Sequence, residues 1–197
     1  GNIPELADLP FENITVEQVN RPEALIFGHQ VMPDYIVTFG CSILREPWLS
    51  THGGRILGIH LGLSPYYRGA GTNFFPFVNN ELAAVGYTLM NLDAGVDTGS
   101  ILHQRYANFV VGDSIHTAGT RLMTAMFEDI CQLLASEVNL DSALPQPEYP
   151  GLIYKESDFT EMTLRIALNN LREGAVELHL ENQERDRQSF PLIRAVL

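Results

Sequence analysis

Two side chains suited to proton transfer stand near the middle of the chain. His60 closes a short apolar run, Arg55–His60, and precedes a stretch rich in turn-forming residues. That placement exposes an imidazole at the edge of a sheet, and histidine exchanges protons near neutral pH. Asp97 lies in the loop Asp93–Gly99, from which a carboxylate can orient an imidazole. Taken singly, a lone histidine is more often a core or surface residue, and Asp-Thr-Gly is ordinary turn chemistry.

The order of the residues around this pair carries more information. Residues 61–71 read Leu-Gly-Leu-Ser-Pro-Tyr-Tyr-Arg-Gly-Ala-Gly, and residues 93–99 read Asp-Ala-Gly-Val-Asp-Thr-Gly. Both segments resemble the signature regions of the 10-formyltetrahydrofolate-dependent formyltransferases, a family that includes glycinamide ribonucleotide, methionyl-tRNA and sugar-amine transformylases. The residues that match in the family's order are His60, Pro65, Arg68, Gly69 and Asp97. Residues 33–44 and 154–159 also resemble family segments, so the resemblance runs from about residue 19 to residue 174.

The resemblance implies that His60 and Asp97 are the catalytic pair of a formyl transfer from 10-formyltetrahydrofolate to an amine. Such a reaction needs a stabilised oxyanion and a group that takes a proton from the attacking nitrogen, and an imidazole beside a carboxylate suits both needs. The residues that the resemblance places at the folate site are Phe39, Gly40, Cys41, Ile43, Leu44, Asp93, Ala94, Gly95 and Val96. Those expected at the acceptor site are Tyr66, Tyr67, Arg68 and Asn73, although paired tyrosines are more often packing residues.

Gly58 departs from the family pattern. It stands two residues before His60, where the family has a catalytic asparagine. The missing amide is an oxyanion-hole donor, whose loss in comparable sites costs about 2.7–4 kcal/mol, or about 10² to 10³ in rate. Three interpretations are open: another donor such as Asn73 replaces it, the protein is a weak or specialised transferase, or it is a folate-binding or scaffold relative without transfer activity. Glycine also lets another backbone or a ligand approach closely.

The charge of the chain bears on the acceptor. Twelve Lys and Arg stand against 24 Asp and Glu, a net charge of −12, and the basic residues are mostly scattered. Such a chain repels phosphate backbones and anionic lipid, so neither nucleic acid nor a membrane is expected as a partner. The expected acceptor is a primary amine of a small molecule. Residues 66–69 resemble the sugar and tRNA branches more than the purine branch, which favours an amino sugar. Hydrolysis of 10-formyltetrahydrofolate, with water replacing the amine, is a further alternative.

Cysteine usage and hydropathy predict a cytoplasmic protein. Cys41 and Cys131 are far apart and form no CxxC or Cys/His pattern, so neither a disulfide framework nor a zinc site is expected. The histidines form no HxxxH or HExxH arrangement, and no metal is expected. No apolar run approaches the roughly 20 residues of a membrane span, and the first residues do not read as a targeting signal.

The hydrophobic pattern predicts the elements that must position these residues. Strands are predicted over residues 35–39, 55–60, 85–90 and 101–111. Helices are predicted over residues 20–32, 72–82 with a break at Pro76, from Ser114 to about 134, and 161–172. This alternation predicts a Rossmann-like α/β fold, a mainly parallel sheet with helices on both faces. Ligands bind at the carboxyl ends of strands in such sheets, where we expect His60 and Asp97.

Three stretches are expected along the chain. Residues 1–18 read as a linker or irregular lead-in, residues 19–138 as the catalytic core, and residues 139–197 as a proline-rich connector, a C-terminal helix and a charged tail. The family's domain normally opens with further strands and helices before the segment that matches residues 33–44, so N-terminal strands of the sheet are expected to be missing here. An open sheet edge would then need cover from further residues, a partner or a homodimer.

Overall fold

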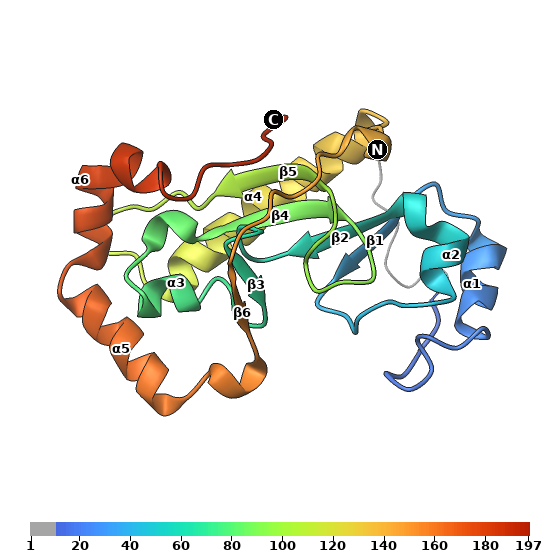
Figure 1. The fold of residues 1–197 in the computed structure, drawn as a ribbon, viewed down its shortest axis with the longest axis horizontal. Helices are drawn as coiled ribbons and strands as arrows, with labels where there is room; N and C mark the ends of the chain where they lie inside the picture. The colour runs from blue at the N-terminus through green and yellow to red at the C-terminus, as the bar shows by residue number, and fades with distance from the viewer. Residues whose placement is uncertain (1–10) are drawn as a thin grey trace.

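The computed structural model describes residues 11–197, so the first ten residues of the predicted lead-in lie outside the described part. A four-stranded sheet has the order β1 (Ile36–Phe39), β2 (Ile56–His60), β4 (Gly86–Asn91) and β5 (Ile101–Tyr106) (Figure 1). A smaller sheet pairs β3 (Tyr67–Gly69) with β6 (Leu152–Tyr154). The α-helices are α1 (Ala24–Val31), α2 (Trp48–His52), α3 (Phe75–Val78), α4 (Ile115–Ala135), α5 (Glu161–Arg172) and α6 (Ala175–Arg187). Short 3₁₀ helices occupy Gly53–Arg55, Leu82–Ala84, Leu140–Ser142 and Glu156–Asp158.

The predicted Rossmann-like α/β class is confirmed, with helices packed on a mixed sheet. β1 and β2 pair in parallel, and the chain between them contains the helical crossover that parallel strands require. β4 runs antiparallel to both β2 and β5, which corrects the expectation of parallel pairing for these strands. For β4 and β5 the reason is that residues 92–100 join them as a loop, without a crossover helix to reverse the chain direction.

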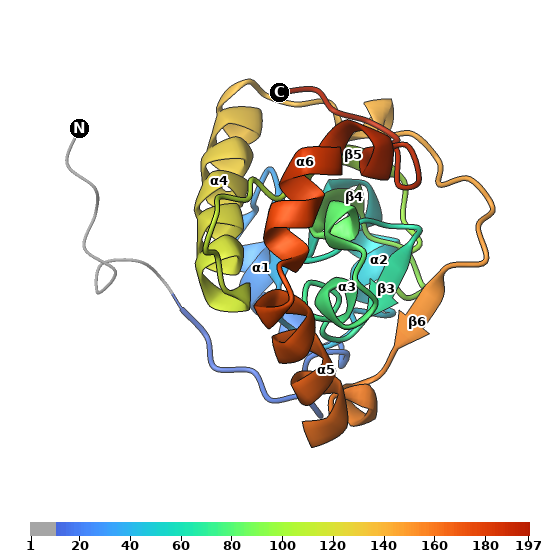
Figure 2. The same cartoon turned by 90° about the vertical axis from the view of Figure 1, so that its left-hand side faces the viewer.

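The helices group around the sheet in three places. α4 lies along one face of β4 and β5, while α3, α5 and α6 gather at the end of the molecule opposite to α1 and α2 (Figures 1 and 2). The C-terminal tail runs beside β5, where the Gln104 N–H donates to the Arg194 carbonyl at 2.8 Å and the Val196 N–H donates to His103 Nδ1 at 3.0 Å. No helix within residues 11–197 has the length and apolar content needed to cross a membrane.

Most predicted elements form near their expected bounds. Ser114 caps α4, because its hydroxyl accepts a hydrogen bond from the Thr117 N–H at 3.1 Å, and α5 has the predicted limits. The helix expected over residues 72–82 shortens to α3, with Pro76 in its first turn, and the strand expected to reach residue 111 ends at Tyr106. α6 forms where only a charged tail was expected. Its apolar pattern is weak because few of its residues are buried: Ala175, Val176 and His179.

Two hydrophobic clusters hold these layers together. The larger one joins the sheet to α3, α4, α5 and α6, and its fully buried members include Leu57, Tyr87 and Met126. The smaller one joins α1 and α2 to β2 through Ala24, Leu25, Leu44, Trp48 and Ile56. Because Leu44 is buried in the smaller cluster, the segment after β1 is anchored close to β2.

Candidate active site

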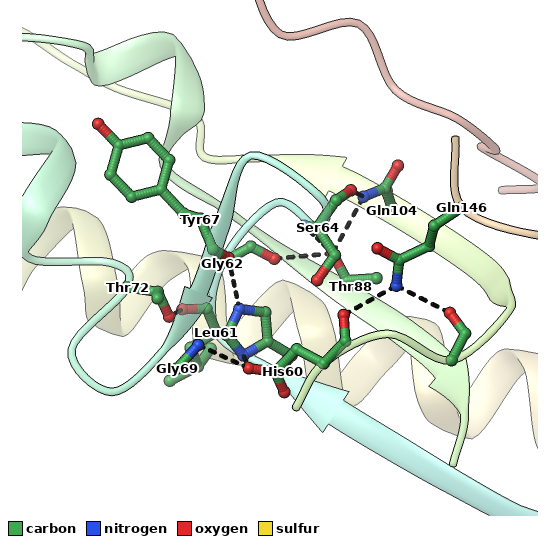
Figure 3. A network of polar contacts seen from close by, with 12 residues as sticks. His60, Leu61, Gly62, Ser64, Tyr67, Gly69, Thr72, Thr88, Gln104 and Gln146 are labelled. Carbon is green, nitrogen blue, oxygen red and sulfur yellow. Dashed lines mark hydrogen bonds and ion pairs between the residues drawn. The ribbon is translucent and has the colours of Figure 1, made fainter. Parts of the chain in front are cut away.

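His60 and Asp97 meet at the end of β2. His60 is buried, with 6% of its surface exposed, and its Nδ1 lies 3.3 Å from Oδ2 of Asp97. Its Nε2 lies 2.8 Å from the backbone carbonyl of Tyr67 (Figure 3). A carbonyl oxygen only accepts, so Nε2 carries a proton in this arrangement. A ring protonated at both nitrogens donates to both partners, whereas a neutral ring would leave Nδ1 and the carboxylate facing each other as two acceptors.

The two side chains arrive from opposite directions. His60 ends β2, but the register pairs Leu57 with Asn91, so the carboxyl end of β4 lies beside the start of β2. The loop after β4 must therefore run back along β2 before Asp97 can reach His60. The expectation that both residues occupy strand carboxyl ends at one sheet edge holds for His60 and is corrected for Asp97.

Hydrogen bonds from two distant segments hold Asp97. The Gly69 N–H donates to Oδ2 of Asp97 at 2.8 Å. The side-chain amide of Gln146 donates to the carbonyls of Asp97 and Gly99, at 2.9 and 2.8 Å (Figure 3). Asp97 itself has a φ of 53°, in the left-handed region that few non-glycine residues adopt. Sequence reasoning missed Gln146, because a single glutamine in a proline-rich connector gives no pattern that points to a loop far away in the chain.

The loop that carries Asp97 is also braced internally. The Asp93 carboxylate accepts hydrogen bonds from the Gly95 N–H at 3.0 Å and the Thr98 hydroxyl at 2.8 Å. The loop is tightly folded, since a Cβ added at Gly95 would lie 1.9 Å from Oγ1 of Thr98 and one added at Gly99 would lie 1.7 Å from the Asn91 carbonyl oxygen. Both glycines are therefore required by close approach.

A cavity of about 120 Å³, the loop cavity, opens beside this pair. The residues that line it are Thr38, Gly40, Cys41, Ser42, Ile43, Leu44, Gly58, Ile59, His60, Met90, Leu92, Asp93, Gly95, Val96 and Asp97. It thus brings together most of the residues expected at the folate site, and burial there raises the pKa of the Cys41 thiol. Phe39 and Ala94 are not among its lining residues. Phe39 points to the opposite face of the sheet, where its ring contacts Phe127 of α4 edge to face.

A second cavity, the helix-side cavity, has a volume of about 500 Å³. It is lined from the sheet, from the segment before and within α3, and from the first turns of α4, and its residues include Phe39, Ile59, His60, Asn73, Phe74, Phe77, His116, Thr120 and Met123. Asn73, expected at the acceptor site, therefore lies here, with its Oδ1 accepting from the Gly86 N–H at 3.1 Å. His60 lies between the two cavities, because it lines both.

The neighbouring acceptor candidates lie elsewhere. Tyr66 and Tyr67 are core residues, 5% and 1% exposed, and neither lines the loop cavity or the helix-side cavity. The Tyr66 hydroxyl donates to the Pro191 carbonyl at 2.7 Å, and burial raises the pKa of Tyr66 to about 12. The Tyr67 hydroxyl contacts the Glu81 carboxylate. Arg68 is half-buried on β3, and its Nε has no hydrogen-bond partner among residues 11–197. What Tyr67 contributes to the site is its backbone carbonyl.

Gly58 faces the loop cavity from β2. A Cβ added there would lie 3.0 Å from Cδ1 of Leu92 and 3.6 Å from the Met90 carbonyl oxygen. Cδ1 of Leu92 would therefore have to move by a few tenths of an ångström to admit a side chain at position 58. Asn73 is not among the residues that line this cavity, so an amide from Asn73 would have to reach the reacting atoms from the helix-side cavity.

A buried glutamine fixes the turn that follows β2. Gln104, 1% exposed, donates from Nε2 to the Ser64 carbonyl at 2.7 Å and to the Thr88 hydroxyl at 3.0 Å (Figure 3). The Thr88 hydroxyl in turn donates to the Gly62 carbonyl at 2.7 Å. Oε1 of Gln104 accepts from the Ile193 N–H at 2.8 Å, which ties the C-terminal tail to the same network. Sequence reasoning missed Gln104, because it stands between the polar residues His103 and Arg105 of β5 and nothing local sets it apart.

The arrangement offers two titratable groups in contact: His60 is buried between the two cavities, and the partly exposed Asp97 lies on the wall of the loop cavity. Among the described residues, no group of three or more His, Cys, Asp and Glu side chains is placed to hold a metal ion. The chemistry that the chain's own groups can supply is hydrogen-bond donation from an imidazole and proton acceptance by a carboxylate.

Comparison with known proteins gives concordant matches. The family model described as Formyl transferase matches residues 4–132. A methionyl-tRNA formyltransferase of Solibacter usitatus is 28% identical over 190 residues, 93% of this chain and 57% of the relative. One of Thermotoga neapolitana is 31% identical over 157 residues, 76% of this chain and 50% of the relative. The chain thus spans about half the length of the curated relatives it matches.

Solved structures show the same likeness. The formyltransferase PseJ from Anoxybacillus kamchatkensis, in complex with UDP-4,6-dideoxy-4-formamido-L-AltNAc and tetrahydrofolate, superposes with a TM-score of 0.54 at 26% identity, over 64% of this chain and 66% of that chain. A phosphoribosylglycinamide formyltransferase from Streptococcus pneumoniae shares the fold, with a TM-score of 0.54 at 24% identity over 61% of this chain and 68% of that chain.

Proposed function

Because this chain belongs to the formyl transferase family, we propose that it moves a formyl group from 10-formyltetrahydrofolate to a primary amine of a small molecule. His60 and Asp97 are the proposed catalytic pair. The observation that carries the proposal is the 3.3 Å contact between their side chains on the wall of the loop cavity, where two segments expected at the folate site also meet.

The two members of the pair divide the proton chemistry. Attack of a neutral amine on the formyl carbon forms the new C–N bond, puts negative charge on the formyl oxygen and leaves the attacking nitrogen with a proton to lose. When the C=O double bond forms again, the bond from the formyl carbon to the folate nitrogen breaks, and that nitrogen takes up the proton as tetrahydrofolate leaves. For this, an N–H group of His60 would turn from its present partner, the Tyr67 carbonyl or Asp97, to donate to that oxygen as the charge develops, and the Asp97 carboxylate would accept the proton. Because the two side chains are in contact, they can serve adjacent atoms of the same reacting centre.

The loop cavity suits the ring end of a folate. The segments that line it come from residues 40–44 and from the loop that holds Asp93 and Asp97, and Gly40, where an added Cβ would meet nothing within 4 Å, lets a flat ring approach the backbone. Its volume of about 120 Å³ is below the roughly 300–1,000 Å³ of pockets that enclose drug-sized ligands. The bicyclic ring would therefore enter and the remainder of the molecule would lie over the rim. Bound there, 10-formyltetrahydrofolate supplies the formyl group.

We assign the acceptor to the helix-side cavity. This cavity shares His60 with the loop cavity, and its volume of about 500 Å³ lies within the usual range for small-molecule sites. Phe74 offers an aromatic surface, while Asn73 and Thr120 offer polar groups. A net charge of −12 disfavours a tRNA acceptor, and the solved formyltransferase with 26% identity is in complex with a nucleotide-linked formamido sugar. An amino sugar is therefore the acceptor that we propose.

One observation favours a second candidate function. Gly58 lacks the amide of the family pattern, and Leu92 fills the adjacent space, so the site is short of one oxyanion donor. A relative that binds folate without transferring its formyl group would have this composition. Transfer remains our first proposal because the His60–Asp97 contact is retained.

The proposal is tested by incubating the chain with 10-formyltetrahydrofolate and a panel of amines: nucleotide-linked amino sugars, glycinamide ribonucleotide and methionyl-tRNA. Tetrahydrofolate release that depends on an amino sugar supports the proposal, and release with another acceptor reassigns the substrate. Release without any amine indicates hydrolysis, and folate binding without release supports the second candidate.

The catalytic pair is tested in the same assay. We expect His60→Ala to lower turnover by about 10² to 10⁴, the range for loss of a general acid–base group, while folate affinity changes only a few-fold. His29→Ala is the matched control, because His29 is an exposed histidine on α1 that lines neither cavity. Turnover by His60→Ala equal to that of the control would remove His60 from the mechanism.

A further inference from the structure

Gln146 reaches the candidate active site from outside the segment that supplies the other site residues. It lies in the connector between α4 and β6, and its half-buried side chain points at the Asp97 loop (Figure 3). Its single amide nitrogen donates to two carbonyls, those of Asp97 at 2.9 Å and Gly99 at 2.8 Å. No other donor among residues 11–197 reaches either carbonyl. One amide therefore spans the backbone on both sides of Thr98.

The connector holds Gln146 in place for this contact. Two residues earlier, Leu144 bonds to Ile101 at the start of β5 in both directions, with N–H to carbonyl distances of 2.7 and 2.8 Å. Pro145 and Pro147 flank Gln146, and a residue that precedes proline is restricted to extended conformations. Gln146 is thus fixed in register by a β-bridge and in backbone conformation by its neighbours, so little further backbone entropy is lost when its side chain makes this contact.

The loop needs such support because Asp97 is strained. A φ of 53° at a residue other than glycine is sparsely populated and persists only where the surroundings over-determine it. Gly69 holds the carboxylate, whereas Gln146 holds the backbone that carries it. Without the second contact, the loop can relax toward ordinary backbone angles, and the carboxylate would then leave Nδ1 of His60.

We propose that Gln146 is a positioning residue of the formyl-transfer site, which keeps the Asp97 carboxylate against His60 by fixing the left-handed backbone of the loop. The proposal rests on the proposed function for its kinetic consequence, but the structural part stands on the hydrogen bonds alone. Gln146 touches none of the reacting groups and acts through Asp97.

The first test measures the loop directly. Gln146→Met keeps the length of the side chain and removes both hydrogen bonds. We expect amide hydrogen exchange in residues 93–99 to become at least about tenfold faster in this variant, since the loop opens locally more often. Gln132→Met is the matched control, because Gln132 is an exposed glutamine on α4, and it should leave exchange in the loop unchanged.

The second test asks whether the effect passes through Asp97. We expect Gln146→Met to lower kcat by about tenfold to a hundredfold, as displacement of a catalytic group does. In the Asp97→Asn background the same substitution should lower kcat by less than about twofold, because there is no carboxylate left to misplace. A purely structural role would lower kcat equally in both backgrounds.

The outcomes separate the two proposals. Unchanged exchange in residues 93–99, or an equal loss of kcat in the unaltered and the Asp97→Asn backgrounds, overturns the role of Gln146. Absence of turnover in the unaltered chain would contradict the proposed function instead. In that case the exchange measurement by itself would test the role of Gln146. If Gln146→Met does not fold, Gln146→Asn replaces it, because its amide is one methylene too short to reach both carbonyls, and the same criteria apply.

Discussion

Leu92 stands over Gly58: a Cβ added to the glycine would lie 3.0 Å from Cδ1 of the leucine. Leu92 is half-buried against the smaller hydrophobic cluster, and its N–H donates to the Ile56 carbonyl at 3.0 Å. Its backbone is therefore fixed, and only its side chain can give way. The two positions form a pair, in which the small residue on β2 and the large residue after β4 share one volume.

This pairing predicts that restoring an amide requires two substitutions. We expect Gly58→Asn alone to lower the free energy of unfolding by about 1–3 kcal/mol through overpacking, without a faster reaction. Combined with Leu92→Val, which removes the obstructing methyl, it should recover most of that stability and raise the rate by up to about 10² to 10³ if the donor is limiting. Denaturant unfolding and initial rates check both parts, with Leu92→Val alone as the control. A rate increase in the single Gly58→Asn variant would show that Leu92 does not block the position.

Cys41 provides a chemical probe of the loop cavity. Cys41 is exposed, but partial desolvation beside the cavity raises the pKa of its thiol, so it holds less reactive thiolate at a given pH than an unperturbed cysteine does. We expect iodoacetamide to modify Cys41 slowly near neutral pH and faster as the pH rises toward the raised pKa. A folate that occupies the cavity should slow the reaction at Cys41 at least several-fold. Mass spectrometry of the modified peptides measures this.

Cys131 supplies the internal control for that experiment. It is an exposed cysteine on α4 and lines neither the loop cavity nor the helix-side cavity. Folate should leave its modification rate unchanged. Equal protection of both cysteines would indicate a general stabilisation of the chain, and no protection of Cys41 would place the folate elsewhere.

The ionisation of Asp113 makes the free energy of unfolding depend on pH. Arg121 donates to both of its oxygens, at 2.7 and 2.9 Å, and these bonds together with the Val110 N–H lower the pKa of the Asp113 carboxyl from 3.8 to about 2. A pKa depressed in the folded state stabilises the fold above the unfolded value, and this contribution is lost as the pH falls from about 4 to about 2. Since the Arg121 side chain is partly exposed, we expect Asp113 to contribute about 1–2 kcal/mol to the free energy of unfolding.

Denaturant unfolding between about pH 2 and pH 6 tests this contribution. We expect Asp113→Asn to have a lower free energy of unfolding near pH 6 than the unaltered chain. On acidification, that free energy should fall by less in the variant than in the unaltered chain. Asp141→Asn is the control, because Asp141 is an exposed aspartate in a 3₁₀ helix. Identical pH profiles for Asp113→Asn and the unaltered chain would contradict the assignment.

Local patterns predicted the elements that carry a strong signal. The apolar runs of β1, β2 and β4 and the capped, periodic α4 form as expected, because each is specified by its own residues. The three-residue strands β3 and β6 were missed, since so short a segment has no period and depends on its partner. The antiparallel direction of β4 was missed for a similar reason: alternation of strands and helices does not determine which way each strand runs.

The candidate active site divides in the same way. His60 and Asp97 were predicted from residue order, and the structure places them in contact. Tyr66 and Tyr67 were expected at the acceptor site, but aromatic rings in that turn gain more from burial than from facing a polar ligand, and they pack into the core. Leu92 and Gln146 contact residues that are distant in the sequence, Gly58 and the Asp97 loop. Neither a packing contact nor a hydrogen bond between distant segments can be predicted from the local sequence.

Gln104 ties the turn after β2 to the C-terminal tail, so evolution cannot change the two segments independently. Its amide serves the turn after β2 on one side and the C-terminal tail on the other. A substitution of Gln104 that kept the hydrogen bond to the tail would be selected against if it broke the hydrogen bonds to the turn beside His60. A substitution that kept the bonds to the turn and broke the bond to the tail would be selected against as well. We therefore expect the amino-acid sequence of the tail to vary less among relatives than that of other exposed segments, and position 104 to be among the least variable positions.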